Sequence, residues 1–167
     1  MTFRADSPTV AKVTPSPSHD ARDARIDILL LHYTGMPTAE EALARLTDKE
    51  SKVSSHYFVH EDGRIEQLVP EARRAWHAGI SSWRARAACN DYSVGIELEG
   101  TDDLPYASAQ YLMLARLARA LRRRYPITDM VGHSDVAPGR KSDPGATFDW
   151  PKLGRLLGAT PTGGRAD

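Results

Sequence analysis

The sequence predicts an α/β fold: a single domain with a mixed β-sheet flanked by helices on both faces. Three observations favour it. Strand-like and helix-like segments alternate along the chain, the apolar segment 26–33 is typical of a strand buried on both faces, and a hairpin signal over 55–69 rules out a purely parallel sheet. A length of 167 residues suits one domain with a sizeable core.

Local patterns predict the elements of the first half. Residues 26–33 (IDILLLHY) are apolar at nearly every position, which indicates a central strand. Residues 38–41 (TAEE) have the spacing of a capping box, and apolar residues follow at helical intervals as far as Leu46, so a helix begins here. Segments 55–60 and 64–69 flank a turn that contains glycine, which predicts a hairpin.

The second half continues the alternation. Residues 93–98 (SVGIEL) form a further strand with alternating character. Residues 108–125 carry leucines on one stripe and arginines off it, which predicts a long amphipathic helix. A short strand is expected over 129–132, and Asp149 can cap a last helix that reaches Leu157.

The two ends of the chain have a different composition. Residues 1–25 are rich in proline, serine, aspartate and arginine and show no apolar period, which predicts an extended N-terminal arm. Residues 159–167, with proline and glycine, are expected to form a flexible C-terminal tail. The predicted folded domain is therefore 26–158.

Charge and composition limit the partners. The 22 basic residues balance the 22 acidic ones, so no nucleic-acid partner is expected, and Arg122 to Arg124 are interpreted as a solvated helix end. The single Cys89 allows no intramolecular disulfide. Residues 1–20 lack the apolar core of a secretory signal, and no apolar run is long enough for a membrane partner, so we expect a cytoplasmic protein. The sequence predicts no particular oligomeric state.

Three side chains are candidate metal ligands. His32 ends the most apolar strand, His133 follows a short strand, and Asp143 lies in a loop rich in proline and glycine. Two imidazoles and one carboxylate give a catalytic zinc three protein ligands and leave a fourth position for water or substrate. From spacing alone a structural role for each histidine stays open, because the residues are scattered and no HExxH pair is present.

Six segments occur in the order of a known family: 31–35 (LHYTG), 54–57 (SSHY), 75–79 (AWHAG), 94–100 (VGIELEG), 132–135 (GHSD) and 141–145 (KSDPG). The sequence thereby resembles the N-acetylmuramoyl-L-alanine amidase type-2 family, whose fold is shared by peptidoglycan recognition proteins. Segments 90–102 and 137–141 are similar to its anhydro-muropeptide recycling branch in particular. The resemblance covers about 26–157.

The resemblance implies hydrolysis of the amide bond between N-acetylmuramic acid, in its 1,6-anhydro form, and L-alanine of the stem peptide in peptidoglycan recycling. It implies one Zn²⁺ per chain, held by His32, His133 and Asp143, with Glu97 as general base and Lys141 stabilising the oxyanion. The chemistry agrees, because zinc polarises a carbonyl and lowers the pKa of bound water to roughly 7. A carboxylate can then move the proton to the leaving amine, and a cation can face the developing charge.

Four residues are candidates for binding the muropeptide substrate. Trp76 offers a flat face to a sugar ring, although a place in the core is the alternative, and His77 can bond a hydroxyl or the peptide. Arg140 and Arg86 can pair with a carboxylate of the stem peptide.

Other polar residues have less specific interpretations. Glu97 and Glu99 share a face of their strand because side chains alternate, so either can reach the metal on geometry alone, and only the family pattern selects Glu97. We interpret His56 as structural or as a neighbour of the ligands, and we expect His60 and His19 at the surface. Asp135 orients a loop or a ligand, or stabilises a turn.

One departure from the recycling branch concerns specificity. After His32 the chain passes through Tyr33-Thr34-Gly35 directly into a helix, without the longer proline-rich loop of the best-known recycling enzymes. This compact connection resembles outer-membrane and broad-substrate members. The alternatives are therefore a hydrolase of intact peptidoglycan and a non-catalytic peptidoglycan-binding protein. The second typically lacks one of the five catalytic positions, all of which are filled here.

Overall fold

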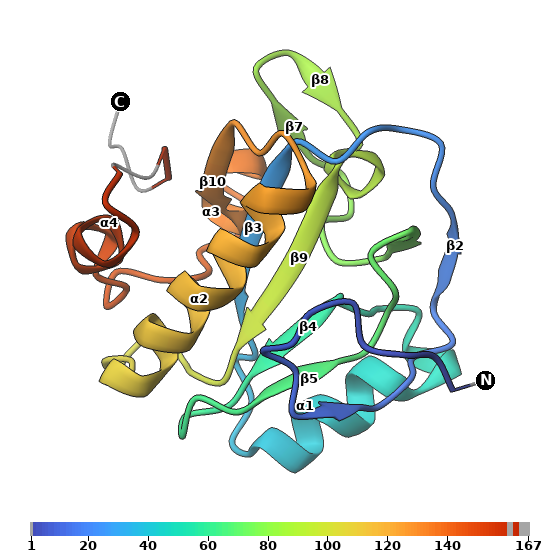
Figure 1. Cartoon of the computed structure of the whole chain (residues 1–167), viewed down its shortest axis with the longest axis horizontal. Helices are drawn as coiled ribbons and strands as arrows, with labels where there is room; N and C mark the ends of the chain where they lie inside the picture. The colour runs from blue at the N-terminus through green and yellow to red at the C-terminus, as the bar shows by residue number, and fades with distance from the viewer. Residues whose placement is uncertain (1, 160–161, 164–167) are drawn as a thin grey trace.

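The computed structural model describes residues 2–159 and 162–163. Its main sheet has six strands in the order β1-β5-β4-β9-β3-β10 (Figure 1). The bounds of these strands are β1 (Lys12–Val13), β3 (Ile28–Tyr33), β4 (Tyr57–Val59), β5 (Ile65–Gln67), β9 (Ser93–Leu98) and β10 (Asp129–Gly132). Two small antiparallel pairs accompany it: β2 (His19–Ala21) with β6 (Arg73–Ala75), and β7 (Ser82–Trp83) with β8 (Arg86–Ala87).

Helical segments connect and cover the strands. They are α1 (Ala39–Thr47), α2 (Ser108–Arg124), α3 (His133–Val136), α4 (Trp150–Leu157) and the short 3₁₀ turns η1 (Lys49–Ser51) and η2 (Cys89–Asp91). The Thr38 hydroxyl accepts a hydrogen bond from the amide of Glu41 at 3.2 Å, and Asp149 accepts one from the amide of Lys152 at 2.8 Å. These caps place the starts of α1 and α4 where the sequence predicts them.

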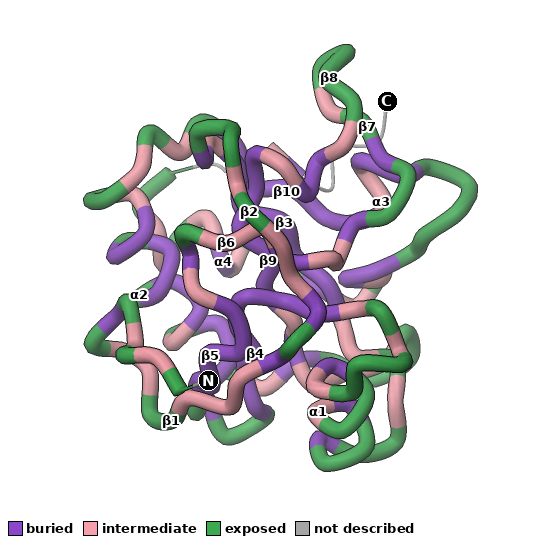
Figure 2. The backbone as a smooth tube through the Cα atoms, turned by 90° about the vertical axis from the view of Figure 1, so that its right-hand side faces the viewer, coloured by how far each residue is buried: buried purple, intermediate pink, exposed green. Residues whose placement is uncertain are grey.

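The sheet is mixed, as the hairpin signal predicts. Strands β4, β9, β3 and β10 run parallel to one another, whereas β5 is antiparallel to β4. The central strands are buried along most of their length, while α1 and α2 carry the exposed turns (Figure 2). The prediction of a single α/β domain with a mixed sheet is confirmed.

Alternation along β3 separates two cores. Leu29 and Leu31 pack in the core beneath α2 and α4, whereas Ile28 and Leu30 pack on the opposite face together with Val136 of α3. On that opposite face α1 packs against Phe58 and Leu68. Helices therefore cover both faces, and the even-numbered positions of β3 face away from α2.

The N-terminal arm contacts the sheet through short strands. Lys12 and Val13 pair in parallel with β5, and residues 19–21 pair with β6. The guanidinium of Arg22 donates hydrogen bonds to backbone carbonyls that include those of Arg73 (2.9 Å) and Ser93 (3.0 Å). This places residues 12–22 against the domain, while the boundary between residues 25 and 26 stays a prediction.

Most of the predicted C-terminal tail lies outside the described residues, namely 160–161 and 164–167. Within the described part, Gly163 donates its amide to the carbonyl of Met130 at 2.7 Å, and the Thr162 hydroxyl accepts from the amide of Met130 at 2.9 Å. Across 2–159 and 162–163, the structure contains no helix that is both long and apolar enough to span a membrane.

Two histidines differ from the expectation of a surface position. His60 is buried, and its Nε2 lies 3.0 Å from a carboxylate oxygen of Glu66. This carboxylate is itself buried at the edge where β1 adds to the sheet, so the two side chains provide each other with a polar partner. His19 is half-buried, and its Nδ1 accepts a hydrogen bond from Arg73 at 3.2 Å.

Candidate metal-centred active site

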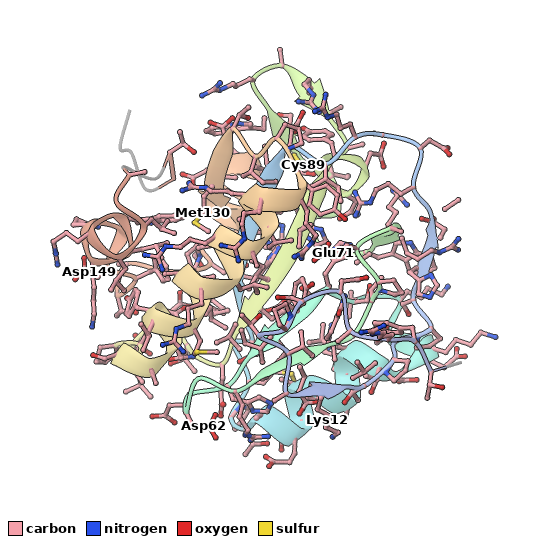
Figure 3. All side chains as sticks on the ribbon, viewed as in Figure 1. Lys12, Asp62, Glu71, Cys89, Met130 and Asp149 are labelled. Carbon is pink, nitrogen blue, oxygen red and sulfur yellow. The ribbon has the colours of Figure 1, made fainter. Side chains whose placement is uncertain are left out.

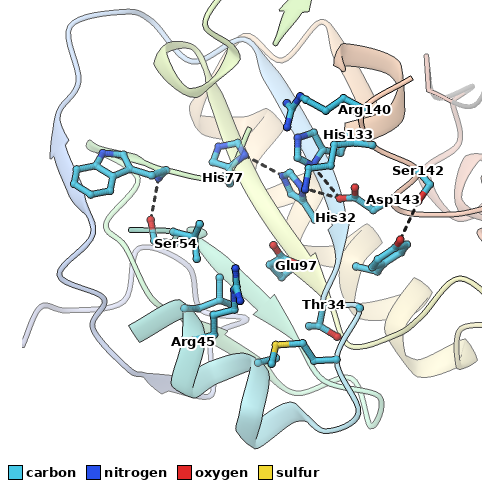
Figure 4. Close-up of a pocket in the computed structure, with 18 residues that line it drawn as sticks. His32, Thr34, Arg45, Ser54, His77, Glu97, His133, Arg140, Ser142 and Asp143 are labelled. Carbon is cyan, nitrogen blue, oxygen red and sulfur yellow. Dashed lines mark hydrogen bonds and ion pairs between the residues drawn. The ribbon is translucent and has the colours of Figure 1, made fainter. Parts of the chain in front are cut away.

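A cavity of about 520 Å³ opens on the face of the sheet opposite α2 (Figure 4). Its walls come from β3 and the segment after it, from α1, from residues 76–77, from β9 and from the loop 140–143. The parallel strands β3, β9 and β10 bring their carboxyl ends together at this edge, which is where ligands bind in α/β sheets.

Three donor atoms converge at one end of this cavity. His32 Nδ1 lies 3.0 Å from His133 Nδ1 and 3.0 Å from Asp143 Oδ2, and the last two atoms are 3.1 Å apart. All three side chains are buried, and within the described residues they form the one group of at least three such side chains that could hold a metal ion. The predicted ligands, separated by up to 111 positions along the chain, are thus brought together.

Burial and mutual contact control the protonation of this cluster. Burial lowers the pKa of His32 to about 4, so its imidazole is neutral near pH 7. Burial of Asp143 opposes ionisation, but its close contacts with the His133 and His32 imidazoles outweigh it and lower the pKa of this carboxyl below its usual range. A neutral imidazole and an ionised carboxylate are the forms that bind metals.

The outward nitrogens of the two imidazoles also have partners. His133 Nε2 lies 3.0 Å from the carbonyl oxygen of Ala78. A carbonyl can only accept, so Nε2 is the nitrogen that donates to it, and Nδ1 is the nitrogen that faces the cluster and is left to bind a metal. His32 Nε2 lies 3.0 Å from Nδ1 of His77, as the dashed line in Figure 4 shows. Outer contacts of this kind orient metal-binding histidines.

Glu97 stands beside the cluster on the neighbouring strand. It is paired with His32 in the register of β9 and β3, and its side chain lines the cavity. Its Oε2 is buried and, among the described residues, has no hydrogen-bond partner. Burial raises the pKa of Glu97 well above its usual range, repulsion from Asp143 adds to this, and Lys141 partly opposes it. Such a carboxyl is suited to proton transfer.

The loop before Asp143 supplies two cations with different surroundings. Lys141 is exposed and lines the cavity. Arg140 also lines it, but its guanidinium donates to the carbonyls of Ala78 at 2.8 Å and Ile80 at 2.5 Å. Arg140 therefore holds the segment whose Ala78 carbonyl also orients His133.

Trp76 and His77 both line the cavity, in different ways. Trp76 is half-buried, and its backbone amide donates to the Ser54 hydroxyl at 2.9 Å. The His77 ring lies between His32 and Ser93, at 3.0 and 3.2 Å. It also covers Gly95, where an added Cβ would stand 2.5 Å from the ring. His77 is thus engaged by protein groups on both nitrogens.

Two charged residues lie elsewhere. Arg86, on β8, is not among the cavity residues; it pairs with Asp27 at 2.8 Å and its guanidinium carbon lies 3.7 Å from the centre of the Tyr92 ring. Glu99 follows the last residue of β9 and also lies outside the cavity, accepting a hydrogen bond from the Glu61 amide at 2.9 Å. Glu97 therefore lies in the cavity and Glu99 outside it, although the alternation of side chains along the strand predicted that either could reach the metal.

Three further residues have structural contacts. His56 is buried, its Nδ1 accepts from the Gly95 amide at 3.0 Å, and burial lowers its pKa to about 3. Asp135 accepts a hydrogen bond from the Gly132 amide at 2.6 Å, across the start of α3. Cys89 is buried in the interior, with its sulfur 3.2 Å from the Tyr92 hydroxyl (Figure 3).

Arg45 is a cavity residue that the sequence analysis missed. It is exposed, lies on α1 and lines the cavity at the end removed from the cluster (Figure 4). A signal was present, because Arg45 directly precedes Leu46 and follows Ala42 by three positions, and both neighbours are buried. Helical spacing therefore puts Arg45 at the border of the buried stripe.

The mixed sheet and the cluster define an α/β protein whose metal-donor site and buried acid–base group lie at the carboxyl edge of parallel strands. Residues 22–146 match the model of the N-acetylmuramoyl-L-alanine amidase family, and the chain belongs to this family. A 1,6-anhydro-N-acetylmuramyl-L-alanine amidase AmpD of Salmonella typhimurium is 43% identical over 88% of this chain and 90% of its own length.

Two solved structures support the same assignment. A crystal structure of a selenomethionine derivative of AmpD superposes with a TM-score of 0.84 at 40% identity, covering 94% of this chain and 99% of that one. The amidase AmiD of E. coli, solved with the substrate anhydro-N-acetylmuramic acid-L-Ala-D-γ-Glu-L-Lys, gives a TM-score of 0.74 at 41% identity. That match covers 84% of this chain and 61% of AmiD.

Proposed function

We propose that this chain is a zinc-dependent amidase that cleaves the bond between N-acetylmuramic acid, preferably in the 1,6-anhydro form, and L-alanine in soluble muropeptides. The observation that carries the proposal is the convergence of His32, His133 and Asp143 next to the buried carboxyl of Glu97. The names of the AmpD relatives and the substrate in the AmiD complex support the choice of bond.

The donor set fits zinc. Four-coordinate zinc with nitrogen and oxygen ligands at about 2.0–2.1 Å has donor atoms roughly 3.3 Å apart at the edges of its tetrahedron. The three donors here are 3.0–3.1 Å apart. Because Nε2 of His133 donates to the Ala78 carbonyl, its Nδ1 is the nitrogen available to bind the ion beside the carboxylate of Asp143. His32, His133 and Asp143 would hold the ion.

When bound, zinc supplies the Lewis acidity that polarises the amide carbonyl and makes water a stronger acid. Glu97 transfers the proton of the reaction, and Lys141 stabilises the negative charge that develops. Glu97 takes the proton of the attacking water at its carboxylate and returns one to the nitrogen of L-alanine as the C–N bond breaks. Lys141 faces the same cavity and stabilises the charge that develops on the carbonyl oxygen.

The remaining walls of the cavity bind the substrate in this proposal. Trp76 provides an apolar face for the sugar, and Arg45 a cation for a stem-peptide carboxylate. Arg140 has the weaker case for direct binding, because backbone carbonyls already occupy its guanidinium. Arg86 has no positional support, since it lies outside the cavity.

A second candidate function is hydrolysis of intact peptidoglycan. One observation favours it: only residues 34–38 separate β3 from α1, so this connection contributes no long loop over the cavity. An open cavity would accept both anhydro and reducing-end muramic acid. We therefore propose a preference for the anhydro sugar, not an absolute requirement.

The two candidates differ in substrate and in location. The chain's similarity to the recycling amidases, together with a free buried Cys89, supports action in the cytoplasm. The experiment digests anhydro-muropeptide, reduced muropeptide and intact sacculi side by side and follows the products by mass spectrometry. We expect kcat/KM to be highest for the anhydro form. Faster release from sacculi, with recovery of the native protein outside the cytoplasm, would favour the wall hydrolase.

A further inference from the structure

Behind His32 a row of hydrogen bonds leads away from the cavity. His32 Nε2 lies 3.0 Å from His77 Nδ1, and His77 Nε2 lies 3.2 Å from the hydroxyl oxygen of Ser93. That hydroxyl in turn donates to the backbone carbonyl of Cys89 at 2.6 Å. Four residues from three separate parts of the chain thus form one line that begins at a backbone carbonyl and ends at the donor cluster.

The carbonyl determines the direction of every bond in this row. It can only accept, so the single hydroxyl proton of Ser93 points to Cys89, and the Ser93 oxygen can only accept from His77. His77 therefore carries its proton on Nε2, and its Nδ1 is left as an acceptor. His32 Nε2 must then be the donor, which leaves His32 Nδ1 with its lone pair directed at His133 and Asp143.

We propose that His77 and Ser93 are positioning residues that hold His32 in the tautomer able to bind the metal, so that the serine hydroxyl acts on the metal site through two imidazoles. The inference rests on the proposed metal site. It gives His77 a role different from the predicted contact with substrate. The opposite tautomer would place a proton on His32 Nδ1, in the centre of the cluster, where it would compete with the ion.

Packing keeps the row in place. Ser93 is fully buried on β9, and the His77 ring lies on Gly95, where any Cβ would collide with it. The backbone amide of His77 donates to the side-chain oxygen of Asn90 at 3.0 Å. The rings of His77 and His32 meet edge to face, with centroids 5.1 Å apart and planes at 82°. These contacts restrain the planes of both rings. The donor and acceptor roles along the row therefore follow from the tautomers, with both rings in the same rotamers.

The tautomers can be observed directly. The full-length chain with ¹⁵N-labelled histidine, measured near pH 7 by long-range ¹H–¹⁵N NMR with and without zinc, should show His77 protonated at Nε2 and bare at Nδ1. His32 should be protonated at Nε2 in both states. A proton on Nδ1 of His77 would overturn the proposal.

Zinc affinity provides a second readout. Competition with a chromophoric chelator should show an affinity about tenfold lower in Ser93→Ala and about 10–100-fold lower in His77→Leu, the usual range for groups that orient a ligand. His77→Asn can keep an acceptor oxygen near the place of Nδ1, so it should lie between His77→Leu and the parent. Ser55→Ala removes an equally buried hydroxyl outside the row and should leave the affinity unchanged.

The outcomes separate this proposal from the proposed function. Neither the tautomers nor the zinc affinities require a muropeptide, so they remain measurable if no amide is cleaved. Thermal unfolding of the metal-free variants checks that both are folded. Equal zinc affinities for Ser93→Ala and Ser55→Ala would then disprove the positioning role of Ser93 and His77. If His77 and His32 have the expected tautomers and the zinc affinities change as expected, but no muropeptide is cleaved, the proposed amidase function is disproved and the positioning role is not.

Discussion

His32 and Glu97 occupy paired positions on the adjacent parallel strands β3 and β9. Both strands alternate between the core beneath α2 and the opposite face, and both side chains fall on the opposite face, where the cavity lies. One residue joins the donor cluster, and the other keeps a buried carboxyl oxygen without a protein partner among the described residues. The register of two strands thus places an acid–base group beside a metal-donor group.

Replacement of Glu97 by glutamine should cut turnover by about 10²–10⁴, the usual contribution of a positioned general acid–base group. The amide cannot take up the proton of the attacking water, yet it preserves the volume of the side chain. Zinc content should stay unchanged, because Glu97 is not part of the donor cluster. Turnover of purified muropeptide and elemental analysis measure the two effects.

Glu99→Gln is the matched control for this experiment. Glu99 lies two positions further along but outside the cavity, so its loss should reduce turnover much less. A larger loss for Glu99→Gln than for Glu97→Gln would contradict the assignment of the general base.

Removal of the metal should abolish hydrolysis. The purified chain is expected to hold about one zinc, and a strong chelator should stop cleavage, because neither the carbonyl nor the water is then activated. His133→Ala should lose the zinc, whereas His19→Ala, which changes a half-buried histidine outside the cavity, should retain it. Undiminished hydrolysis in chelator, from a chain without stoichiometric metal, would disprove the metal site.

The metal-free chain should lose stability through Glu97 as the pH rises. The pKa of Glu97 is raised in the folded state, so the unfolded chain releases this proton first, near pH 4.3, and the folded chain releases it only at higher pH. The contribution of Glu97 to the free energy of unfolding therefore falls from about pH 4.3 up to the folded pKa. Glu97→Gln removes this loss.

Urea unfolding of the metal-free parent and of Glu97→Gln at a series of pH values tests this sign. Above pH 4.3 the stability of the variant relative to the parent should increase with pH. A difference between the two that does not change with pH would show that burial does not destabilise the ionised form of Glu97.

Arg45→Ala should raise KM for a muropeptide with an intact stem peptide by about two- to fivefold, which is the contribution of an exposed ion pair of up to ~1 kcal/mol. The kcat and the zinc content should change little, since Arg45 lies at the other end of the cavity from the donor cluster. Arg123→Ala, which removes an exposed arginine of α2 outside the cavity, is the control. Equal KM values for the two variants would exclude Arg45 from substrate binding.

Much of the fold could be read from local patterns. The strand predicted at 26–33 appears as β3 (Ile28–Tyr33). The helix that starts after Thr38, the hairpin around Gly63 and the helix capped by Asp149 also appear in the structure. Each depends on a local cause, such as an apolar run, a cap or a turn glycine, that neighbouring residues supply.

The three candidate metal ligands could be predicted from the sequence only because the motifs that contain them occur in the order of a known family. His32 and Asp143 are 111 positions apart, and no local pattern reports that their side chains meet at 3.0 Å. The parallel pairing of β3 with β9 and β10 brings their carboxyl ends to one edge, and this pairing is a long-range property of the sheet.

By itself, the sequence determined the main strands and helices, the mixed character of the sheet and the ordered family motifs, because periodicity and capping act over a few residues. The short strands β1, β2, β6, β7 and β8 were not predicted. Only the tertiary structure decided which residues share the cavity. Glu99 lies outside it, where its carboxylate accepts a hydrogen bond from the Glu61 amide, and Arg86 lies outside it, where Asp27 and Tyr92 hold its guanidinium. His77 lies behind His32 because a glycine on β9 gives its ring room. Each of these placements depends on packing between segments that are distant in the chain, which no local pattern encodes.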